Sequence, residues 1–241
     1  MCTVTFIPSR DNIFITSNRD EKNTRSPARP PALYGNSGER MIYPRDGDAG
    51  GTWISMKENG DAAVLLNGAF ISHVAEPPYR KSRGLLFLDI FGTERPSQAF
   101  FKMNLYGIEP FTFLLYEKNC LYEFRWDGTE RYGKQLAVSR PHIWSSATLY
   151  DGLAVKKREQ WFAAFLNLNP SPTQLDILNF HRFSGEGDAQ NDLLMNRDDL
   201  YATVSITGIM LTNDRGSMKY LAMQDNRISE MKIELVESPR V

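Results

Sequence analysis

The chain has 241 residues, 41% of them apolar, and its 28 basic and 29 acidic side chains leave a formal net charge of −1. This length and apolar fraction suit a soluble globular protein, and we predict that residues 1–241 form a single domain. The near-neutral charge argues against binding to nucleic acid or to a membrane surface through bulk charge. The longest apolar run, around residues 111–116, is too short to span a membrane.

Strand patterns open the sequence. Residues 3–7 and 13–17 alternate and are rich in β-branched side chains, and a polar turn separates them, which predicts an N-terminal hairpin. The Pro-rich segment 22–49 is expected to be a surface loop. We expect further strands over residues 51–56, 62–67, 111–117, 120–126, 135–138, 142–145, 203–212, 218–223 and 228–236.

Helical periodicity is confined to the middle of the chain. We expect helices over residues 83–91, 96–103, 153–168 and 172–183. The third of these has one apolar face that includes Trp161, Phe162 and Phe165. Strands at both ends with helices between them predict an α+β fold in which two layers of sheet have helices packed outside.

The second residue, Cys2, is the first candidate for chemistry. If Met1 is removed, Cys2 carries a thiol and a free α-amine on one residue. The amine, with a pKa of roughly 7.7–8.0, could take the proton of a thiol whose pKa is roughly 8.5. One residue would then supply both nucleophile and base. The simpler interpretation is that Cys2 only begins a strand.

The tetrapeptide Asn18-Arg19-Asp20-Glu21 follows the predicted hairpin. Antiparallel pairing brings residue 2 into register with about residue 19. An Arg beside a cysteine favours the thiolate, and an Asp beside an α-amine orients that amine. Taken alone, the run equally fits a solvated charge cluster in a turn.

Two further short motifs are weaker by themselves. The paired glycines of Gly50-Gly51-Thr52-Trp53 allow close backbone approach or a bulge before a strand, or form a plain turn. Asn67-Gly68 ends a strand, where the Asn67 amide could donate a hydrogen bond to an oxyanion or simply form a turn. Cys120 lies among apolar residues and is expected to be a buried, inert thiol.

Together these residues resemble a family. Met1-Cys2, Asn18-Arg19-Asp20-Glu21 and Gly50-Gly51-Thr52-Trp53 occur at the spacing of the NRDE family, which is also called the transport and Golgi organisation protein 2 family. Lys81-Ser82-Arg83-Gly84, Ser145-Ser146-Ala147 and the strand at 205–212 add to the match. The resemblance implies an N-terminal nucleophile hydrolase fold, a four-layer αββα sandwich of two antiparallel sheets flanked by helices.

The same resemblance implies roles for five residues. In the related bile salt and penicillin V acylases, an N-terminal Cys attacks an amide carbonyl. Carried over, Cys2 is the nucleophile, Arg19 contacts the thiolate and substrate, and Asp20 orients the amine, although its spacing from Arg19 differs from the acylase pattern. Asn67 is the first oxyanion donor, and Ser146 stands where the second donor is expected.

The chain departs from the family pattern at two positions. The family usually has Ser-Asn where this chain has Ser145-Ser146, and a hydroxyl reaches less far than an amide. Losing an oxyanion donor typically costs roughly 2.7–4 kcal/mol of barrier. The late strand carries Thr203-Val204-Ser205 where the family often has Thr-Arg-Ser, so an inherited anchoring charge is missing.

Two classes of function remain open. The first is a cysteine hydrolase of a non-peptide linear amide or related acyl bond, and the second is a non-catalytic protein that binds a lipid or haem on the same fold. We expect a small-molecule amide, acyl or lipid-like ligand, no cofactor and no metal site, because His73, His142 and His181 are scattered. No basic-then-apolar leader is present, so we expect a cytoplasmic protein.

Overall fold

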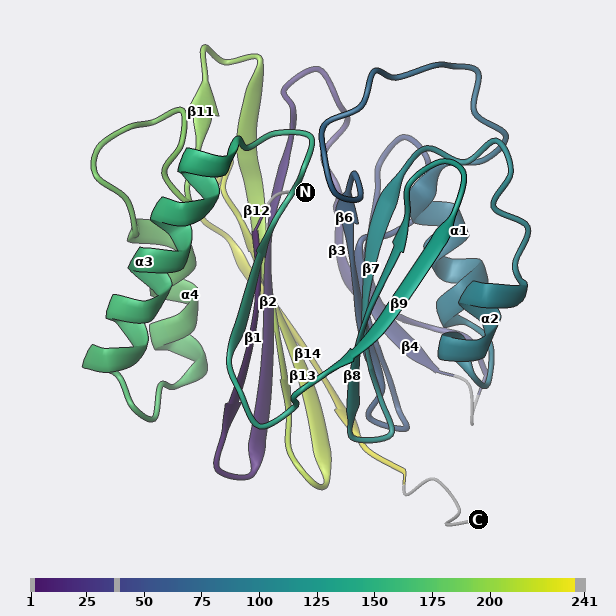
Figure 1. Cartoon of the computed structure of the whole chain (residues 1–241). Helices are drawn as coiled ribbons and strands as arrows, with labels where there is room; N and C mark the ends of the chain where they lie inside the picture. Colours follow the sequence, from purple (N-terminus) through teal and green to yellow (C-terminus); the bar gives the residue numbers. More distant parts are fainter. Residues whose placement is uncertain (1–2, 37–39, 237–241) are drawn as a thin grey trace.

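The computed structural model describes residues 3–36 and 40–236. These residues form two antiparallel sheets of seven strands each, and the sheets lie face to face between two pairs of helices (Figure 1). Helices α3 (Gly152–Leu168) and α4 (Gln174–Phe183) cover one outer face, and α1 (Arg83–Phe91) and α2 (Pro96–Lys102) cover the other. This is the four-layer αββα sandwich expected from the sequence.

The first sheet joins the two ends of the chain. Its order is β10 (His142–Ser145), β1 (Thr3–Ser9), β2 (Asn12–Lys22), β12 (Tyr201–Leu211), β13 (Arg215–Ala222) and β14 (Ile228–Glu234), with β11 (Asn196–Arg197) beside β12. The second sheet is sequential, with the order β3 (Arg29–Tyr34), β4 (Met41–Arg45), β5 (Ile54–Lys57), β6 (Ala62–Asn67), β7 (Phe111–Glu117), β8 (Cys120–Trp126) and β9 (Arg131–Leu136).

The register around β1 determines what surrounds the start of the described chain. Thr3 pairs with Asn18 of β2 on one side and with Ser145 of β10 on the other. Arg19 therefore follows directly after one partner of Thr3, and Ser146 follows after the other. Because side chains alternate between faces, a slip of one residue would exchange the two faces of this strand.

Apolar side chains fill the space between the sheets and beneath each helical layer. The larger cluster includes Phe6, Ile15, Leu65 and Phe113. The second includes Phe162 of α3 and lies between the first sheet and helices α3 and α4. Burial of such side chains stabilises each by about 1.5–3 kcal/mol.

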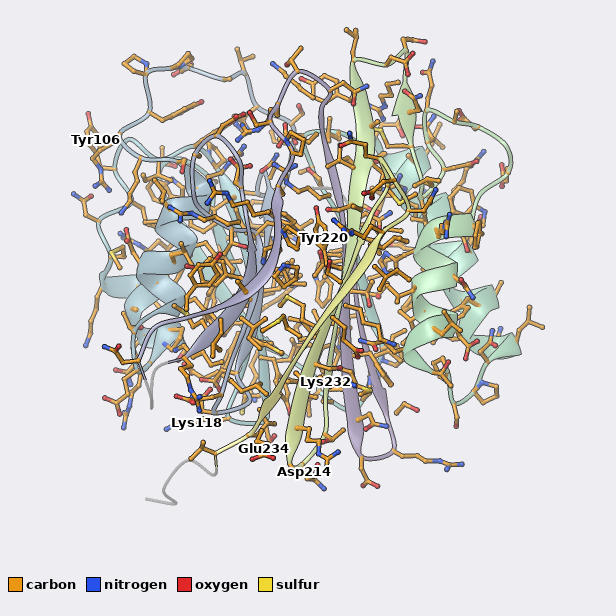
Figure 2. All side chains as sticks on the ribbon, turned by 180° about the vertical axis from the view of Figure 1, so that it is seen from behind. Tyr106, Lys118, Asp214, Tyr220, Lys232 and Glu234 are labelled. Carbon is orange, nitrogen blue, oxygen red and sulfur yellow. The ribbon has the colours of Figure 1, made fainter. Side chains whose placement is uncertain are left out.

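The labelled side chains show where the middle and the far end of the sandwich lie. Figure 2, seen from behind, shows Tyr220 between the two sheets, whereas the turns with Lys118 and Asp214 lie at the far, lower end. No helix in the described parts of the chain is long and apolar enough to cross a membrane.

The structure differs from the predicted elements mainly in the segment 22–49, which is not a loop throughout. It contains β3 and β4, and β3 is an edge strand. Pro30 and Pro31 lie in β3, where the pairing with β4 is irregular between Arg29 and Ala32. An edge position tolerates prolines because their missing N–H groups are not needed by a second neighbour. Cys120 is half-buried rather than buried.

A buried histidine joins the layer of helices α3 and α4 to the first sheet through hydrogen bonds. His181 of α4 is fully buried, with its Nε2 2.8 Å from Thr5 Oγ1 and its Nδ1 2.5 Å from Asn18 Oδ1. Because the Asn18 amide N–H group donates to backbone carbonyls, its oxygen accepts, so His181 donates from Nδ1 and accepts at Nε2. Burial and the charge of Arg158 lower the pKa of His181 to about 3.

This histidine predicts an acid-sensitive stability. Its pKa is about 6.5 when unfolded and lower when folded, so its contribution is complete above pH 6.5 and is lost as the pH falls. We expect the free energy of unfolding to fall by up to about 1.4 kcal/mol per pH unit between pH 6.5 and 5. The free energy of unfolding, measured by urea denaturation at several pH values, should fall less steeply with decreasing pH for His181→Gln than for the wild type. His142→Gln should keep the wild-type dependence on pH. Equal slopes for wild type and His181→Gln would contradict this account.

Candidate active site

A cavity of about 400 Å³ lies where both sheets meet the start of α1. Its walls come from β2, the segment between β4 and β5, the end of β6 and the first turn of α1. Residues of four of the sequence motifs line it, among them Arg19, Trp53, Asn67 and Arg83. The fold therefore brings together motifs that lie far apart in the chain.

Arg19 faces the cavity from β2 and is only 4% exposed. Its guanidinium donates to Asp46 Oδ2 at 2.5 Å, and its Cζ lies 4.6 Å from the centroid of the Trp53 ring. A desolvated Arg over an indole face gains a cation–π attraction in addition to its ion pair. Both contacts hold the guanidinium in one place.

Arg19 belongs to a cluster of ion pairs. Asp46 also pairs with Arg25 at 2.7 Å, and Glu21 lies 3.5 Å from Arg19. Burial raises the pKa of Asp46, but the Ala49 N–H and the two guanidiniums outweigh it, so the pKa lies below its usual value. The carboxylate therefore stays ionised and offsets the positive charge that the sequence assigns to Arg19.

Asp20 points to the opposite face of β2, toward the helices, and is 2% exposed. Tyr150 Oη donates to its Oδ2 at 2.9 Å, and Thr203 Oγ1 donates to its Oδ1 at 2.5 Å. Hydrogen bonds to both oxygens fix the carboxylate plane. Arg19 and Asp20 thus approach the start of β1 from different faces of the sheet, which is not apparent from their adjacency in sequence.

Asn67 ends β6 with its side chain at the cavity wall. Within residues 3–36 and 40–236, no hydrogen bond partner is found for its amide, which leaves the N–H groups available to a ligand. The backbone beyond it turns at Gly68, whose φ of 78° is in the left-handed region. Gly68 is held in turn by Pro110 and Thr112.

Ser146 is fully buried and lies beside Asn67. Its hydroxyl donates to the Asn67 carbonyl oxygen at 2.9 Å and lies 3.0 Å from Thr148 Oγ1. A hydroxyl has a single proton to donate, so this bond competes with the predicted donation to an oxyanion. In this arrangement Ser146 ties the end of β10 to the end of β6. Its role as a second oxyanion donor stays a prediction.

Cys2 lies outside the described residues, so its predicted role as nucleophile also stays a prediction. The described part of the chain begins with Thr3, the first residue of β1. Thr3 is buried, and its hydroxyl accepts a hydrogen bond from Arg158 Nη1 at 2.5 Å.

A second cavity, of about 510 Å³, lies on the other side of Arg19, Glu21 and Arg25. Val204 lines it together with Tyr220 and Met223. Val204 is the extra residue of a β-bulge, because Thr203 pairs with Asp20 while Ser205 pairs with Arg19. Where the family often has an arginine, this chain therefore presents an apolar side chain to a cavity.

Two glycines determine how closely the walls of the first cavity approach. A Cβ on Gly51 would lie 2.3 Å from the carbonyl carbon of Gly84 in α1, and Thr52 N donates to Gly84 O at 3.2 Å. The close backbone approach that paired glycines permit is therefore present at Gly51. Ser82 caps α1 by accepting from Leu85 N, which presents the first turn of the helix to the cavity.

Sequence reasoning missed several residues that hold the site. Tyr150 and Thr203 bind Asp20, and Asp46 binds Arg19, from positions up to 183 residues away. The sequence marks Thr203 only as part of the Thr203-Val204-Ser205 run and marks neither Tyr150 nor Asp46, because the significance of all three arises from long-range contacts. In the part of the chain that the structure describes, no cluster of His, Cys, Asp and Glu could hold a metal ion.

The two stacked sheets between helical layers are those of the N-terminal nucleophile hydrolase fold. A Caenorhabditis elegans ortholog of N-acylethanolamine-hydrolyzing acid amidase aligns with a TM-score of 0.58 and 11% identity over 86% of this chain and 92% of its own. A mutant of the conjugated bile acid hydrolase from Clostridium perfringens aligns with a TM-score of 0.52 and 9% identity over 100% of this chain and 99% of its own.

The chain itself belongs to the Transport and Golgi organisation 2 family, whose family model matches residues 1–184. A comparison with curated proteins found no match. At identities near 10%, the likeness to the amidase and the bile acid hydrolase establishes the fold and leaves the activity to be argued from the site.

The glycine contact gives a direct test of how this cavity is built. Gly51→Ala should lower the free energy of unfolding by about 1–3 kcal/mol, because the new methyl group overlaps backbone atoms that cannot rotate away. Urea denaturation measures this loss. Gly152→Ala, at a helix start with no atom near the added Cβ, is the matched control and should cost nothing. A Gly51→Ala variant as stable as Gly152→Ala would disprove the contact.

Proposed function

We propose that this protein is a cysteine hydrolase that cleaves a non-peptide linear amide or a related acyl bond, with Cys2 as its nucleophile. One observation carries the proposal. Thr3, to which Cys2 is bonded, pairs with the residues that directly precede Arg19 and Ser146, next to a cavity where the Asn67 amide is open. The proposal assigns the nucleophile to the residue bonded to Thr3, because consecutive Cα atoms are only about 3.8 Å apart.

The residues divide the chemistry between them. Asp20, held by Tyr150 and Thr203, orients the α-amine, and this amine takes the thiol proton. Arg19 contacts the thiolate or the substrate from the cavity side. The sulfur then adds to the carbonyl carbon while the Asn67 amide donates to the developing oxyanion.

The reaction is completed in two balanced steps. The ammonium returns its proton to the leaving amine as the carbon–nitrogen bond breaks, which leaves a thioester on Cys2. Water then adds to the thioester, the amine again accepts a proton, and the acid product departs with the thiol restored. Two structural neighbours, an acid amidase and a conjugated bile acid hydrolase, support this reaction class.

A second candidate function is non-catalytic binding of a small molecule. The hydrogen bond from Ser146 to the Asn67 carbonyl favours it, because the Ser146 hydroxyl then has no proton left to donate to an oxyanion. Of the two predicted oxyanion donors, this leaves the Asn67 amide, which is a weaker arrangement for catalysis. The second cavity, with Val204, Tyr220 and Met223 in its wall, would suit the ligand. If the protein only binds its ligand, Cys2→Ser should leave ligand affinity unchanged. If it is a hydrolase, the same substitution should abolish turnover.

The N-terminal thiol is the first thing to test. Intact-mass measurement should find Met1 removed, because an attached Met1 would displace the α-amine that serves as base. Iodoacetamide should then alkylate Cys2 at least ten times faster than the half-buried Cys120 near pH 7. Retention of Met1, or equal rates for the two thiols, would refute the hydrolase proposal. Screening simple N-acyl amides should reveal turnover that Cys2→Ser abolishes.

The oxyanion donor has its own test on any amide that the wild-type protein cleaves. Asn67→Ala should lower kcat by about 10²–10³ with little change in KM, since its donation strengthens only as charge develops. Asn104→Ala, at an exposed position outside the cavity, should retain full activity. A similar loss in both variants would mean that Asn67 acts through stability rather than through the reaction.

A further inference from the structure

Arg158 of α3 is a buried cation with an unusual set of partners. The residue is 0% exposed, and its guanidinium donates to Thr3 Oγ1 and to the carbonyl oxygens of Asn191 and Asp192. Among the residues of the described ranges, no carboxylate pairs with it. A buried charge without an opposite charge is costly, so a fold that retains one calls for an explanation.

The contrast with Arg19 is informative. Arg19 and Arg25 share Asp46 and Glu21, so the positive charge on the cavity side is largely cancelled. Arg158 is not cancelled in this way and lies against Thr3, the residue bonded to Cys2. The stronger positive field at the start of β1 therefore comes from the helix side of the sheet.

Tyr150 connects this cation to Asp20. The Cζ of Arg158 lies 3.4 Å from the centroid of the Tyr150 ring, and the Cζ of Arg197 lies 5.2 Å from the same centroid. The hydroxyl of this ring donates to Asp20. Cations at the ring make the phenol a stronger donor, and a stronger hydrogen bond spreads the charge of the Asp20 carboxylate.

We propose that Arg158 is a positioning residue that, with Tyr150, sets the proton affinity of the Cys2 amine and thiol. This inference rests on the proposed function. A nearby cation disfavours the ammonium and favours the thiolate, so both groups lose their protons more readily. Arg158 thus counteracts Asp20, whose negative charge alone would keep the amine protonated and useless as a base.

The other charged and titratable groups around the start of β1 come from three elements and one loop. They are Arg19 and Asp20 of β2, Tyr150 before α3, His181 of α4 and Arg197 of β11. His181 accepts from Thr5 at Nε2 and is uncharged at neutral pH, because burial and Arg158 hold its pKa down. Of the cations on the helix side, Arg158 is the one in contact with Thr3.

The test is the pH dependence of Cys2 alkylation by iodoacetamide in a Cys120→Ala background, which needs no substrate. Arg158→Gln should raise the apparent pKa of the Cys2 thiol by about one unit, which at pH 7 means roughly tenfold slower alkylation. Arg158→Lys keeps the charge and should restore the wild-type profile to within a few tenths of a unit. Lys157→Gln removes an exposed charge from the same helix and should change nothing.

Tyr150→Phe keeps the ring but removes the Asp20 hydrogen bond, and it serves if Arg158→Gln does not fold. It should also raise the apparent pKa. An unchanged profile in a folded Arg158→Gln or Tyr150→Phe protein would overturn the inference, as would an equal shift in Lys157→Gln. If wild-type Cys2 reacts no faster than Cys120, the proposed function fails instead, so the two failures are distinguishable.

Discussion

The antiparallel register of β1 between β2 and β10 is the constraint on which the rest of the site depends. It places Thr3 opposite Asn18 and Ser145, and so puts Arg19, Asp20 and Ser146 around one strand end. Burial on both faces enforces this register, because a slip by one residue would turn apolar side chains such as Phe6 toward the wrong layer. The pairing of the first sheet therefore gathers these residues, while the segment between β4 and β5, the end of β6 and the start of α1 supply the rest of the cavity wall.

Much of the architecture could be predicted from the sequence because the signals are local. The strand at 62–67 and the helix at 83–91 agree with the structure to the residue, since hydrophobic period and flanking turn residues fix them. Strand β3 was not predicted because its prolines mask an edge strand, and its inner neighbour β4 lies in the same Pro-rich segment. Partners such as Asp46, Tyr150 and Arg158 could not be predicted, since each meets its target only through long-range pairing.

Electrostatics around the strand end are asymmetric. The cavity side holds a nearly neutral cluster centred on Asp46, which binds two guanidiniums at once. The helix side holds Asp20 between two hydroxyl groups, with a buried cation behind the tyrosine. Sequence reasoning assigned the activating charge to Arg19 because it is adjacent in the motif. The structure places these two neighbours in sequence on different faces of β2, where Arg19 binds Asp46 and Asp20 binds Tyr150 and Thr203.

The two cavities share a wall made of side chains rather than backbone. Arg19, Glu21 and Arg25 border both of them, and Arg25 is partly exposed. Side-chain rotamers exchange in picoseconds to nanoseconds, far faster than loops or domains move. Arg25 is the most exposed member of this partition, and the carboxylates of Glu21, Asp46 and Asp48 hold its guanidinium in place. The boundary between the two chambers is therefore set by side-chain ion pairs, and it can shift without any movement of the sandwich.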